Sequence, residues 1–544
     1  MLRGLLLVSS LLLYISTGWS NEMPGASDPA TIAAGKRIYL KGILPNGHPL
    51  QAERAGGANL EGSAAACVNC HRRSGLGSLE GQIVIPPIIG KYLFSSLEKN
   101  VKDLSVPHVY ATRVKRSPYT ETTVARALRE GIDPDGRTLN YLMPHFALDD
   151  ASVRDLIAYL VNLTNAAVPG VNDEFLHFAT IITPDADPAA ARAMLEVMRK
   201  FIEDKNSFIR GGAKPLVSTS RAIQYRVTRR WSLHVWKLRG DPATWETQLQ
   251  DKLKAEPVFA VISGLGGKTW APIHKFCQDE EIPCMFPNVD LPIDRESDIY
   301  SMYFSRGVLL DSELIAHDIQ AQAATFKPAH VIQVYRHGDI GAAAARALQQ
   351  QREVAGVTFI NRELPAKASA RELHKALAAG AHDALVLWLR PDDVQALPAK
   401  ASGHVYLSGT MAGLEHAPLP AAWRPHTEIA YPVDLPNGRR IRLYYPLGWF
   451  KVRHIKLVNE RVQTDTYLAC GIVSEILNGM LDSFVRDYLL ERTEGMLSHR
   501  LITGYYPRLS LAIGQRFASK GGYLVHLTQP QGEQVQADTG WVIP

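Results

Sequence analysis

The 544-residue sequence lacks the features that nucleic-acid-binding, membrane-embedded and hydrolytic proteins share. No Lys/Arg-rich run stands out, so the net charge of +5 gives no reason to expect nucleic acid. After the N-terminus, no stretch reaches about 18 apolar residues without charges, the length that a spanning helix needs. Gly-x-Ser-x-Gly, His-Glu-x-x-His and Walker patterns are missing, and we expect no catalytic residues. The composition, 46% hydrophobic and 21% charged, is that of a globular chain.

The N-terminus has the layout of a secretory signal peptide. Arg3 precedes an apolar run from Leu5 to Ile15, and small and polar residues follow up to Ser20. The run is too short to cross a bilayer comfortably, although an uncleaved anchor is the alternative. No Cys lies near its end, which disfavours a lipoprotein anchor. We expect residues 1–20 to be a signal peptide and the mature chain to be periplasmic, with no membrane span.

Only five cysteines are present, and two of them form the most specific motif of the chain, Cys67-Val68-Asn69-Cys70-His71. Two thiols at this spacing reach the two vinyl groups of one haem, and the adjoining His71 then ligates the iron. A zinc half-site is the first alternative, but no second ligand pair of similar spacing exists. A redox dithiol is the second, but the surrounding pattern is helical rather than βαβ. The motif therefore predicts one covalently bound haem c.

The other cysteines predict no cofactor. Cys277 and Cys284 flank an expected helix-to-strand turn, and in an oxidising compartment they form a disulfide or stay as two buried thiols. Cys470 stands alone in a helical pattern, as a buried small apolar residue does.

A sixth ligand for the haem iron is expected from Met143, which precedes Pro144 in a loop. A thioether opposite His raises the reduction potential and suits electron transfer. Core packing is the alternative for Met143, and His145 is the main competitor for the position. A six-coordinate iron leaves no open position, which argues against a haem enzyme such as a peroxidase.

The sequence divides at residues 166–172, a short Pro/Gly-containing linker. Before it, the patterns predict helices at Thr31–Leu40, at Glu121–Glu130 with Gly131 as C-cap, and from Asp150 to about Leu163. No strand alternation is evident there, so we expect an all-α domain over residues 22–165.

This region resembles the class I bacterial cytochromes c. The resemblance covers roughly residues 30–165 and rests on Gly35–Tyr39, Cys67–His71, Ala127–Arg137, Met143-Pro144 and Ala158–Leu160, in that order. It implies that Cys67 and Cys70 hold the haem and that His71 and Met143 are the axial ligands.

After the linker, strands and helices alternate, which predicts parallel sheets. Strands are expected at 176–182, 258–263, 282–286, 330–335, 357–362, 384–389 and 405–408. Helices are expected to start at Pro188, near Trp270 and at Gly341, and one long helix is expected from Asp465 to about Leu490. The region is too long to form a single sheet of this kind, so we expect two lobes over residues 173–544.

This second region resembles the type I periplasmic binding proteins, the branched-chain amino acid receptor class. The resemblance rests on Val258–Gly267, Ala271-Pro272, Ile282-Pro283, Val334–Gly341 and Tyr431-Pro432. The final thirty or so residues have no clear counterpart, and Arg221–Trp245, with Trp231 and Trp236, is unusually aromatic and basic. The resemblance implies an α/β clamshell that binds a small molecule between its lobes.

Candidate ligand contacts follow the strand ends, where backbone N–H groups face a ligand. They are Ser263, Gly264, Asn288, Tyr335, Asp339 and Arg390. A structural left-handed turn is the alternative for the turn at Ser263, and turn capping is the alternative for Tyr335 and Asp339.

Two functions remain open from the sequence. The first is one-electron transfer by a periplasmic cytochrome that serves a dehydrogenase or another cytochrome, with the clamshell binding a small molecule or docking the partner. The second is a solute receptor or sensor for an amino acid or small organic acid, with a haem that reports redox state.

Overall fold

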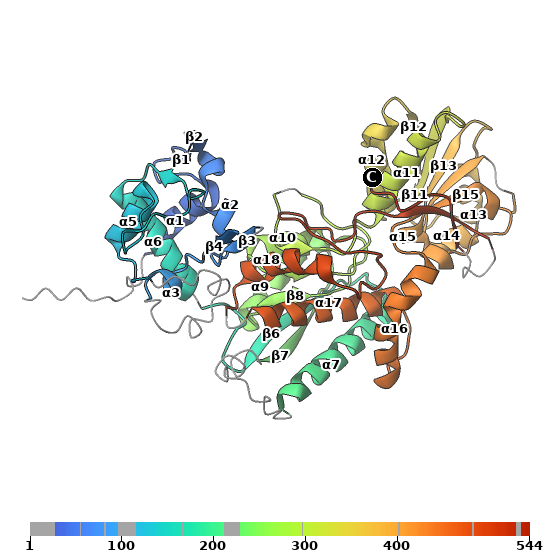
Figure 1. The fold of residues 1–544 in the computed structure, drawn as a ribbon. Coiled ribbons are helices and arrows are strands. Elements are labelled where there is room, and N and C mark those ends of the chain that lie inside the picture. Colours follow the sequence, from blue (N-terminus) through green and yellow to red (C-terminus); the bar gives the residue numbers. More distant parts are fainter. Residues whose placement is uncertain are drawn as a thin grey trace, which may run out of the picture. The chain divides into compact units, whose positions relative to one another are not determined.

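A computed structural model describes residues 28–54, 56–80, 83–95, 116–165, 167–210, 229–295, 297–400, 403–480, 483–528 and 535–544. The expected signal peptide lies outside these residues. The chain forms two compact units, Met1–Ala166 (unit 1) and Ala167–Pro544 (unit 2) (Figure 1). Gly170 of the expected linker lies directly on the backbone of Val258 and Phe259, so this part of the linker belongs to unit 2. Among the described residues, no helix is long and apolar enough to cross a membrane.

Unit 1 is built around helices, and capping residues set the ends of two of them. They are α1 (Pro29–Lys41), α2 (Val68–His71), α3 (Gly90–Leu93), α5 (Glu121–Glu130) and α6 (Asp150–Asn165). The Asp28 side chain accepts from the N–H of Ala30 at the start of α1, and Gly131 ends α5 in the left-handed conformation. The three longest helices confirm the sequence predictions to within a few residues.

Unit 1 also contains strands, so the expectation of an all-α domain is wrong. Strands β1 (Gln51–Arg54), β2 (Ala58–Glu61) and β5 (His145–Phe146) form an antiparallel sheet in the order β2-β1-β5. Strands β3 (Ser78–Glu80) and β4 (Ile83–Ile85) pair antiparallel. Each strand has only two to four residues, too few for a visible alternation of apolar and polar side chains.

Helices α1 and α6 cross at a glycine. A Cβ placed on Gly35 would lie 2.0 Å from the carbonyl oxygen of Asp155, so only a residue without a side chain allows this approach. One turn further, the rings of Tyr39 and Tyr159 lie 5.3 Å apart. This crossing forms the core against which the Cys67–His71 segment is held.

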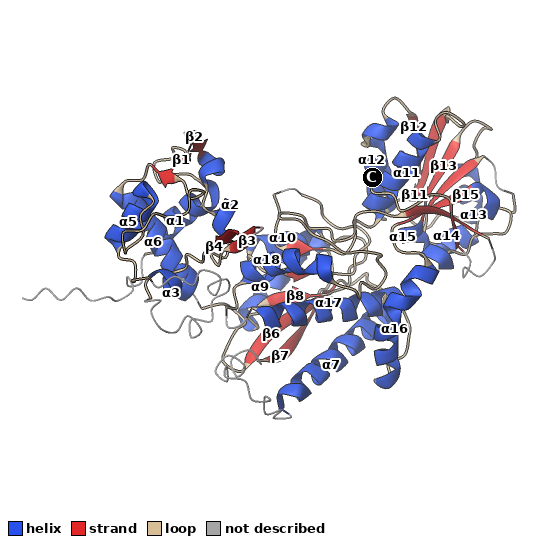
Figure 2. Cartoon of the chain, viewed as in Figure 1, coloured by secondary structure: helices blue, strands red, loops and turns tan. Residues whose placement is uncertain are grey.

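Unit 2 contains two sheets, which define its two lobes. The sheet of lobe 1 is parallel and has the order β10-β9-β8-β6-β7. Its strands are β6 (Phe175–Ile182), β7 (Arg230–Lys237), β8 (Ala260–Ile262), β9 (Cys284–Met285) and β10 (Ser301–Met302). Helices α7 (Pro188–Arg210), α9 (Trp245–Ala255) and α10 (Ala271–Asp279) connect them. Figure 2 shows β6, β7 and β8 flanked by helices.

The aromatic segment that stood out in the sequence is part of this lobe. Trp231 and Trp236 lie on β7, Trp245 begins α9, and all three side chains are buried. They belong to the core of lobe 1 rather than to an aromatic surface.

The sheet of lobe 2 has the order β12-β11-β13-β14-β15-β16-β17. Its parallel strands are β11 (His330–Arg336), β12 (Thr358–Leu364), β13 (Ala384–Trp388), β14 (His404–Ser408) and β15 (Thr427–Tyr431). Its helices are α11 (Val308–Ala321), α12 (Gly341–Gln349), α13 (Ala370–Ala376), α14 (Pro391–Gln395) and α15 (Gly409–Ala412). The C-terminal strands β16 (Tyr523–Leu527) and β17 (Val535–Ala537) extend it antiparallel, which gives the final residues a structural role.

Three further helices are α16 (Pro436–Val452), α17 (Glu460–Gly479) and α18 (Arg486–Met496). Rings on α7, α16 and α17 pack together at Phe201, Trp449 and Tyr467, which fixes α17 to lobe 1. The expectation of a single helix from Asp465 to Leu490 is wrong, because the first helix ends at Gly479. Glycine is a poor helix former, and it follows Asn478, another weak one.

Candidate functional site

The Cys67–His71 motif of unit 1 forms a short turn of helix that presents one neutral imidazole. His71 is buried, and its Nδ1 lies 3.0 Å from the carbonyl oxygen of Pro86. A ring nitrogen facing a carbonyl must donate, which leaves the lone pair on Nε2. Burial lowers the pKa of His71 to about 4, so the ring is uncharged at neutral pH. The hydroxyl of Tyr39 donates to the Arg72 carbonyl at 2.6 Å and ties the motif to α1.

These residues fit a covalently attached haem. Cys67 and Cys70 are partly exposed and lie at either end of one helical turn, and the hydrogen bond between His71 Nδ1 and the Pro86 carbonyl orients the ring so that Nε2 would face the iron. Met143 is partly buried in the loop before β5. Its competitor His145 is exposed on β5, and its ring lies against Gly131. The assignment of Met143 as sixth ligand stays a prediction.

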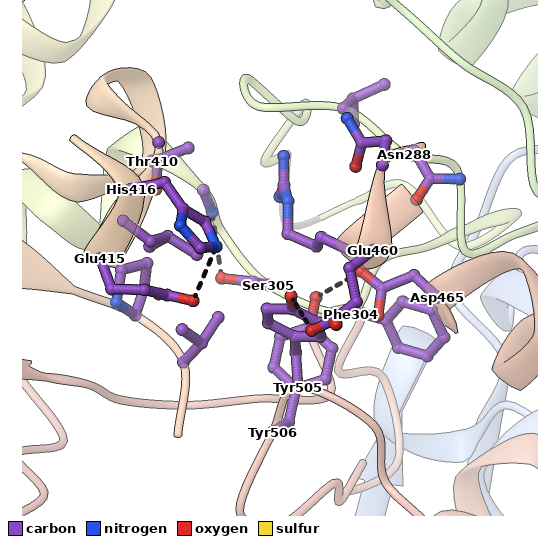
Figure 3. A pocket seen from close by; sticks show the side chains of 18 of the residues that line it. Asn288, Phe304, Ser305, Thr410, Glu415, His416, Glu460, Asp465, Tyr505 and Tyr506 are labelled. Carbon is purple, nitrogen blue, oxygen red and sulfur yellow. Dashed lines mark hydrogen bonds and ion pairs between the residues drawn. The ribbon is translucent and has the colours of Figure 1, made fainter. Parts of the chain in front are cut away.

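Unit 2 has a cavity of about 580 Å³ between its lobes (Figure 3). It lies at the carboxyl ends of the parallel strands, where ligands bind in open α/β sheets. Asn288 follows β9, Ser305 follows β10, and Thr410 follows β14. Further lining residues come from the start of α17 and from the segment after α18, among them Glu460, Arg461, Asp465, Tyr505 and Tyr506.

Asp465 is the most unusual group in the cavity wall. Its side chain is buried, and its Oδ2 accepts from the hydroxyl of Tyr506 at 3.1 Å, while Oδ1 has no hydrogen-bond partner. Burial raises the pKa of Asp465 to about 7, against the opposing effect of Arg461 one helical turn away. The Asp465 carboxyl group therefore keeps one oxygen that can form a hydrogen bond with a ligand in the cavity.

Two other acidic groups of the wall form hydrogen bonds or ion pairs within the protein. Glu415 is buried and forms an ion pair with Arg439, and it also accepts from the hydroxyl of Tyr431. Glu460 accepts from the hydroxyl of Tyr505 at 2.8 Å. These contacts hold the wall in place.

Thr410 is fixed by a buried carboxylate behind the wall. The N–H and hydroxyl of Thr410 donate to Asp311 at 3.1 and 3.0 Å, and the hydroxyl of Ser408 donates to the same group. Burial raises the pKa of Asp311 to about 7. The chain after β14 is therefore attached to α11, which sets the lobe 2 side of the cavity.

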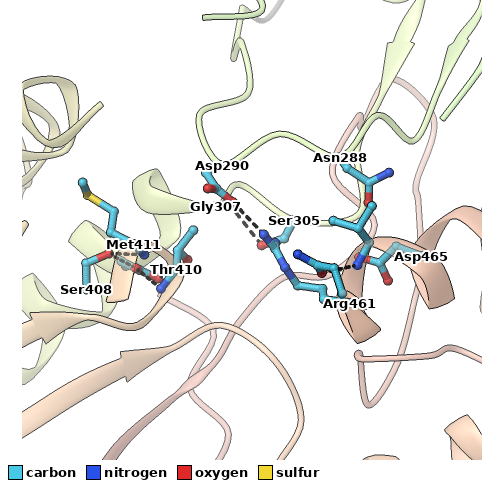
Figure 4. A network of polar contacts seen from close by, with 12 residues as sticks. Asn288, Asp290, Ser305, Gly307, Ser408, Thr410, Met411, Arg461 and Asp465 are labelled. Atoms are coloured by element: carbon cyan, nitrogen blue, oxygen red, sulfur yellow. Dashed lines mark hydrogen bonds and ion pairs between the residues drawn. The ribbon is translucent and has the colours of Figure 1, made fainter. Parts of the chain in front are cut away.

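A chain of ion pairs joins the lobes beside the cavity. Asp290 of lobe 1 accepts from Arg461 at 2.7 Å and from Arg390 of lobe 2 at 3.3 Å. Arg390 also pairs with Asp339 at 3.0 Å. Burial would raise the pKa of Asp290, but the two guanidinium groups lower it below its usual value. Figure 4 shows Asp290 and Arg461 facing each other.

The structure brings only one predicted contact residue, Asn288, to the cavity wall. Asp339 and Arg390 lie next to each other, but as partners in the ion-pair chain. Tyr335 lies on β11, partly exposed and outside the cavity lining. Their role as ligand contacts stays a prediction.

Ser263 and Gly264 lie one layer behind the cavity. Ser263 is fully buried with φ of 54°, and Asn288 Nδ2 donates to its hydroxyl at 3.0 Å. A Cβ on Gly264 would lie 2.9 Å from the ring of Trp270. The N–H groups of Gly266 and Gly267 donate to Asn288 and Thr183 rather than toward the cavity. This turn therefore supports Asn288.

Cys277 and Cys284 are buried, free thiols that lie within hydrogen-bonding reach of each other, so the predicted disulfide is not formed in this structure. It stays a prediction for the oxidising compartment.

Sequence reasoning missed most of the wall. Thr410 follows a predicted strand, and that position is the signal by which it could have been found. Asp465 was taken only as the start of a helix. Tyr505 and Tyr506 follow α18 in an irregular segment that carries no pattern.

Solved structures resemble unit 2 at low sequence identity. A fatty acid ABC transporter substrate-binding protein from Thermomonospora curvata is 16% identical, with a TM-score of 0.51 over 69% of this chain and 94% of that chain. Unit 2 has the fold of the periplasmic substrate-binding proteins. A possible leucine/isoleucine/valine-binding protein from Rhodopirellula baltica (13%, TM-score 0.48, 68% and 97%) and a substrate-binding periplasmic protein from Ralstonia solanacearum (12%, 0.49, 67% and 100%) are also similar.

No protein-family model matches the chain, and no curated protein matches its sequence. The two sheets of unit 2 and its similarity to the solved structure from Thermomonospora curvata confirm the expected α/β clamshell with parallel sheets.

Proposed function

We propose that the protein is a periplasmic receptor that binds a small molecule in the cavity of unit 2. The observation that carries this proposal is the cavity of about 580 Å³ at the carboxyl ends of the strands, with wall residues from both lobes. The similar solved structures are named as binding proteins, which favours binding over catalysis.

The charged groups of the wall narrow the ligand class. Three carboxyl groups line the cavity, and Asp465 keeps one oxygen without a partner. The guanidinium of Arg461 also lines it, already paired with Asp290. Of the two predicted classes, an amino acid suits this wall better than a small organic acid, because its ammonium group can donate hydrogen bonds to Glu460 and to the Asp465 oxygen that has no partner.

Thermal shift measurements on the full chain with amino acids and small organic acids test the receptor function. A ligand at about 100 times its Kd should stabilise unit 2 by about 2.7 kcal/mol. Stabilisation by amino acids and not by simple carboxylic acids supports the proposed class. A flat response across the panel contradicts the receptor function and favours a protein-docking role.

A second function is favoured by the geometry of unit 1. We propose that Cys67 and Cys70 hold one haem c, that His71 Nε2 ligates its iron, and that Met143 is the sixth ligand. The haem supplies reversible one-electron chemistry when bound. The Pro86 carbonyl orients the His71 ring and increases its basicity as a ligand. A periplasmic dehydrogenase or another cytochrome is the expected redox partner.

Optical spectra of the full chain test this second function. The reduced wild type should show methionine ligation of a low-spin haem, and Met143→Ala should lose it while the haem remains bound. His145→Ala is the matched control and should leave the spectrum unchanged. Unchanged ligation in Met143→Ala would refute the assignment.

A further inference from the structure

Three metal-ligating side chains converge in lobe 2, away from the cavity. Asp318 lies near the end of α11, His404 begins β14, and Glu428 lies at the start of β15. Their ligand atoms all lie within 4.8 Å of one another. The cavity is at the carboxyl ends of β14 and β15, whereas this cluster is at their amino ends. The two sites are therefore separate.

His404 is held in a way that no hydrogen bond explains. Its Nε2 lies 3.5 Å from a carboxylate oxygen of Glu428, is shielded from solvent and has no hydrogen-bond partner. The other His–carboxylate pairs of unit 2 include direct contacts, at 2.9 Å for His330–Asp383 and 2.6 Å for His526–Asp538. A separation of about 3.3–3.5 Å is what two ligands of one tetrahedral zinc ion have, given metal–ligand distances of about 2.0–2.2 Å.

Neutral side chains around the cluster orient its carboxyl groups. Gln322 Nε2 donates to Asp318 at 2.6 Å and to Glu428 at 3.1 Å, and the hydroxyl of Tyr406 donates to Asp318 at 2.8 Å. Both donors are uncharged. The ring of Phe326 stacks on His404 with centroids 5.1 Å apart and fixes its plane. Two neighbouring carboxyl groups and a ring nitrogen without a hydrogen-bond partner form a donor set that suits a cation.

We propose that Asp318, His404 and Glu428 bind one divalent transition-metal ion, with Zn²⁺ as the favoured ion. An imidazole ligand favours zinc over magnesium or calcium, which take oxygen ligands. Three protein ligands leave the fourth tetrahedral position to water. The ion links α11 to β14 and β15 and so stabilises lobe 2. This site does not depend on the receptor function.

Zinc titration of the chelator-treated, haem-loaded full chain tests the proposal. We expect one Zn²⁺ per chain and a rise in the unfolding temperature of unit 2. His404→Gln and Glu428→Gln should each weaken zinc binding by about ten-fold or more, and Tyr406→Phe, which removes an orienting hydrogen bond, by about ten-fold. His330→Gln is the matched control, because it removes a His–carboxylate pair of the same lobe; zinc affinity should stay unchanged. Near-UV circular dichroism checks that each variant is folded.

X-ray absorption at the zinc edge identifies the ligands. We expect nitrogen and oxygen neighbours at about 2.0–2.2 Å and no sulfur. A sulfur neighbour would assign the zinc to cysteines and overturn the proposal. Equal zinc affinity in wild type and His404→Gln, or no zinc binding by folded wild type, would overturn it as well and leave the two carboxyl groups sharing a proton.

Discussion

Units 1 and 2 differ in how their proposed functional residues are distributed along the sequence. In unit 1, the residues proposed to attach the cofactor and its first ligand are consecutive, from Cys67 to His71, on one helical turn. In unit 2, the cavity wall is assembled from residues between Pro287 and Tyr506, brought together by strand ends and helix starts of two lobes. A site formed by consecutive residues can be predicted from a short motif. A site formed by residues far apart in the sequence depends on the fold that brings them together.

The largest effect is expected from a substitution that prevents haem attachment to unit 1 and leaves unit 2 unchanged. The double substitution Cys67→Ser and Cys70→Ser should abolish covalent haem attachment, because no thiol remains to form the thioether bonds. Haem staining after denaturing electrophoresis measures this. Calorimetry should still show the unfolding transition of unit 2. Covalent haem in the variant would contradict the assignment, and loss of both transitions would contradict the independence of the units.

A buried ion pair in unit 2 gives the next largest effect. Arg439→Ala leaves Glu415 buried without its counter-charge and should destabilise unit 2 by about 3–5 kcal/mol. Urea unfolding measures the loss. Arg439→Ala combined with Glu415→Gln should be less destabilised than Arg439→Ala alone, since the uncompensated charge is gone. Equal losses would show that packing, not charge, is responsible.

In unit 1, the helix crossing should tolerate no side chain. Gly35→Ala forces α1 away from the Asp155 carbonyl and should cost about 1–3 kcal/mol in the unfolding of unit 1 only. Gly448→Ala in α16 is the control, because nothing lies within 4 Å of the added methyl group. It should stabilise unit 2 slightly, by about 1 kcal/mol. Equal effects of the two substitutions would refute the close crossing.

The titration of Asp465 gives the last expected effect, a pH dependence of the stability of unit 2. The pKa of Asp465 is about 7 in the folded chain and about 3.9 when unfolded, so the folded state keeps a proton that the unfolded state has lost. The free energy of unfolding should therefore fall as pH rises from about 4 to 7. Asp465→Asn removes this titration, and its advantage over wild type should be larger at pH 8 than at pH 5. A constant difference in urea unfolding would contradict the raised pKa.

The sequence predicts the scaffold of both units better than it predicts the assembled site. Capping residues mark α5, and apolar runs mark β6, β11 and β13, because these elements are set by local periodicity. The short strands of unit 1 were missed because two to four residues hold no period. Strand β7 was missed because its two tryptophans, Trp231 and Trp236, masked its alternation.

The cavity shows why the remaining site residues could not be predicted from the sequence. Asn288 was found from its place after a strand, and the same rule would have found Thr410. Arg390 pairs with both Asp290 and Asp339, so the structure places Asp339 and Arg390 in the ion-pair chain, and their role as ligand contacts stays a prediction. Tyr505 and Asp465 come from an irregular segment and a helix start, whose positions depend on long-range packing that no local pattern encodes.

Calorimetric titration of the full chain with the best ligand from the thermal shift panel tests the receptor function most directly. Ser305→Trp fills the cavity from its wall, and Ser305→Ala is the matched variant that leaves the space open. The account predicts one site in wild type, binding retained in Ser305→Ala, and binding lost in folded Ser305→Trp. Unchanged affinity in Ser305→Trp would place the ligand elsewhere and contradict the assignment of the cavity as the binding site.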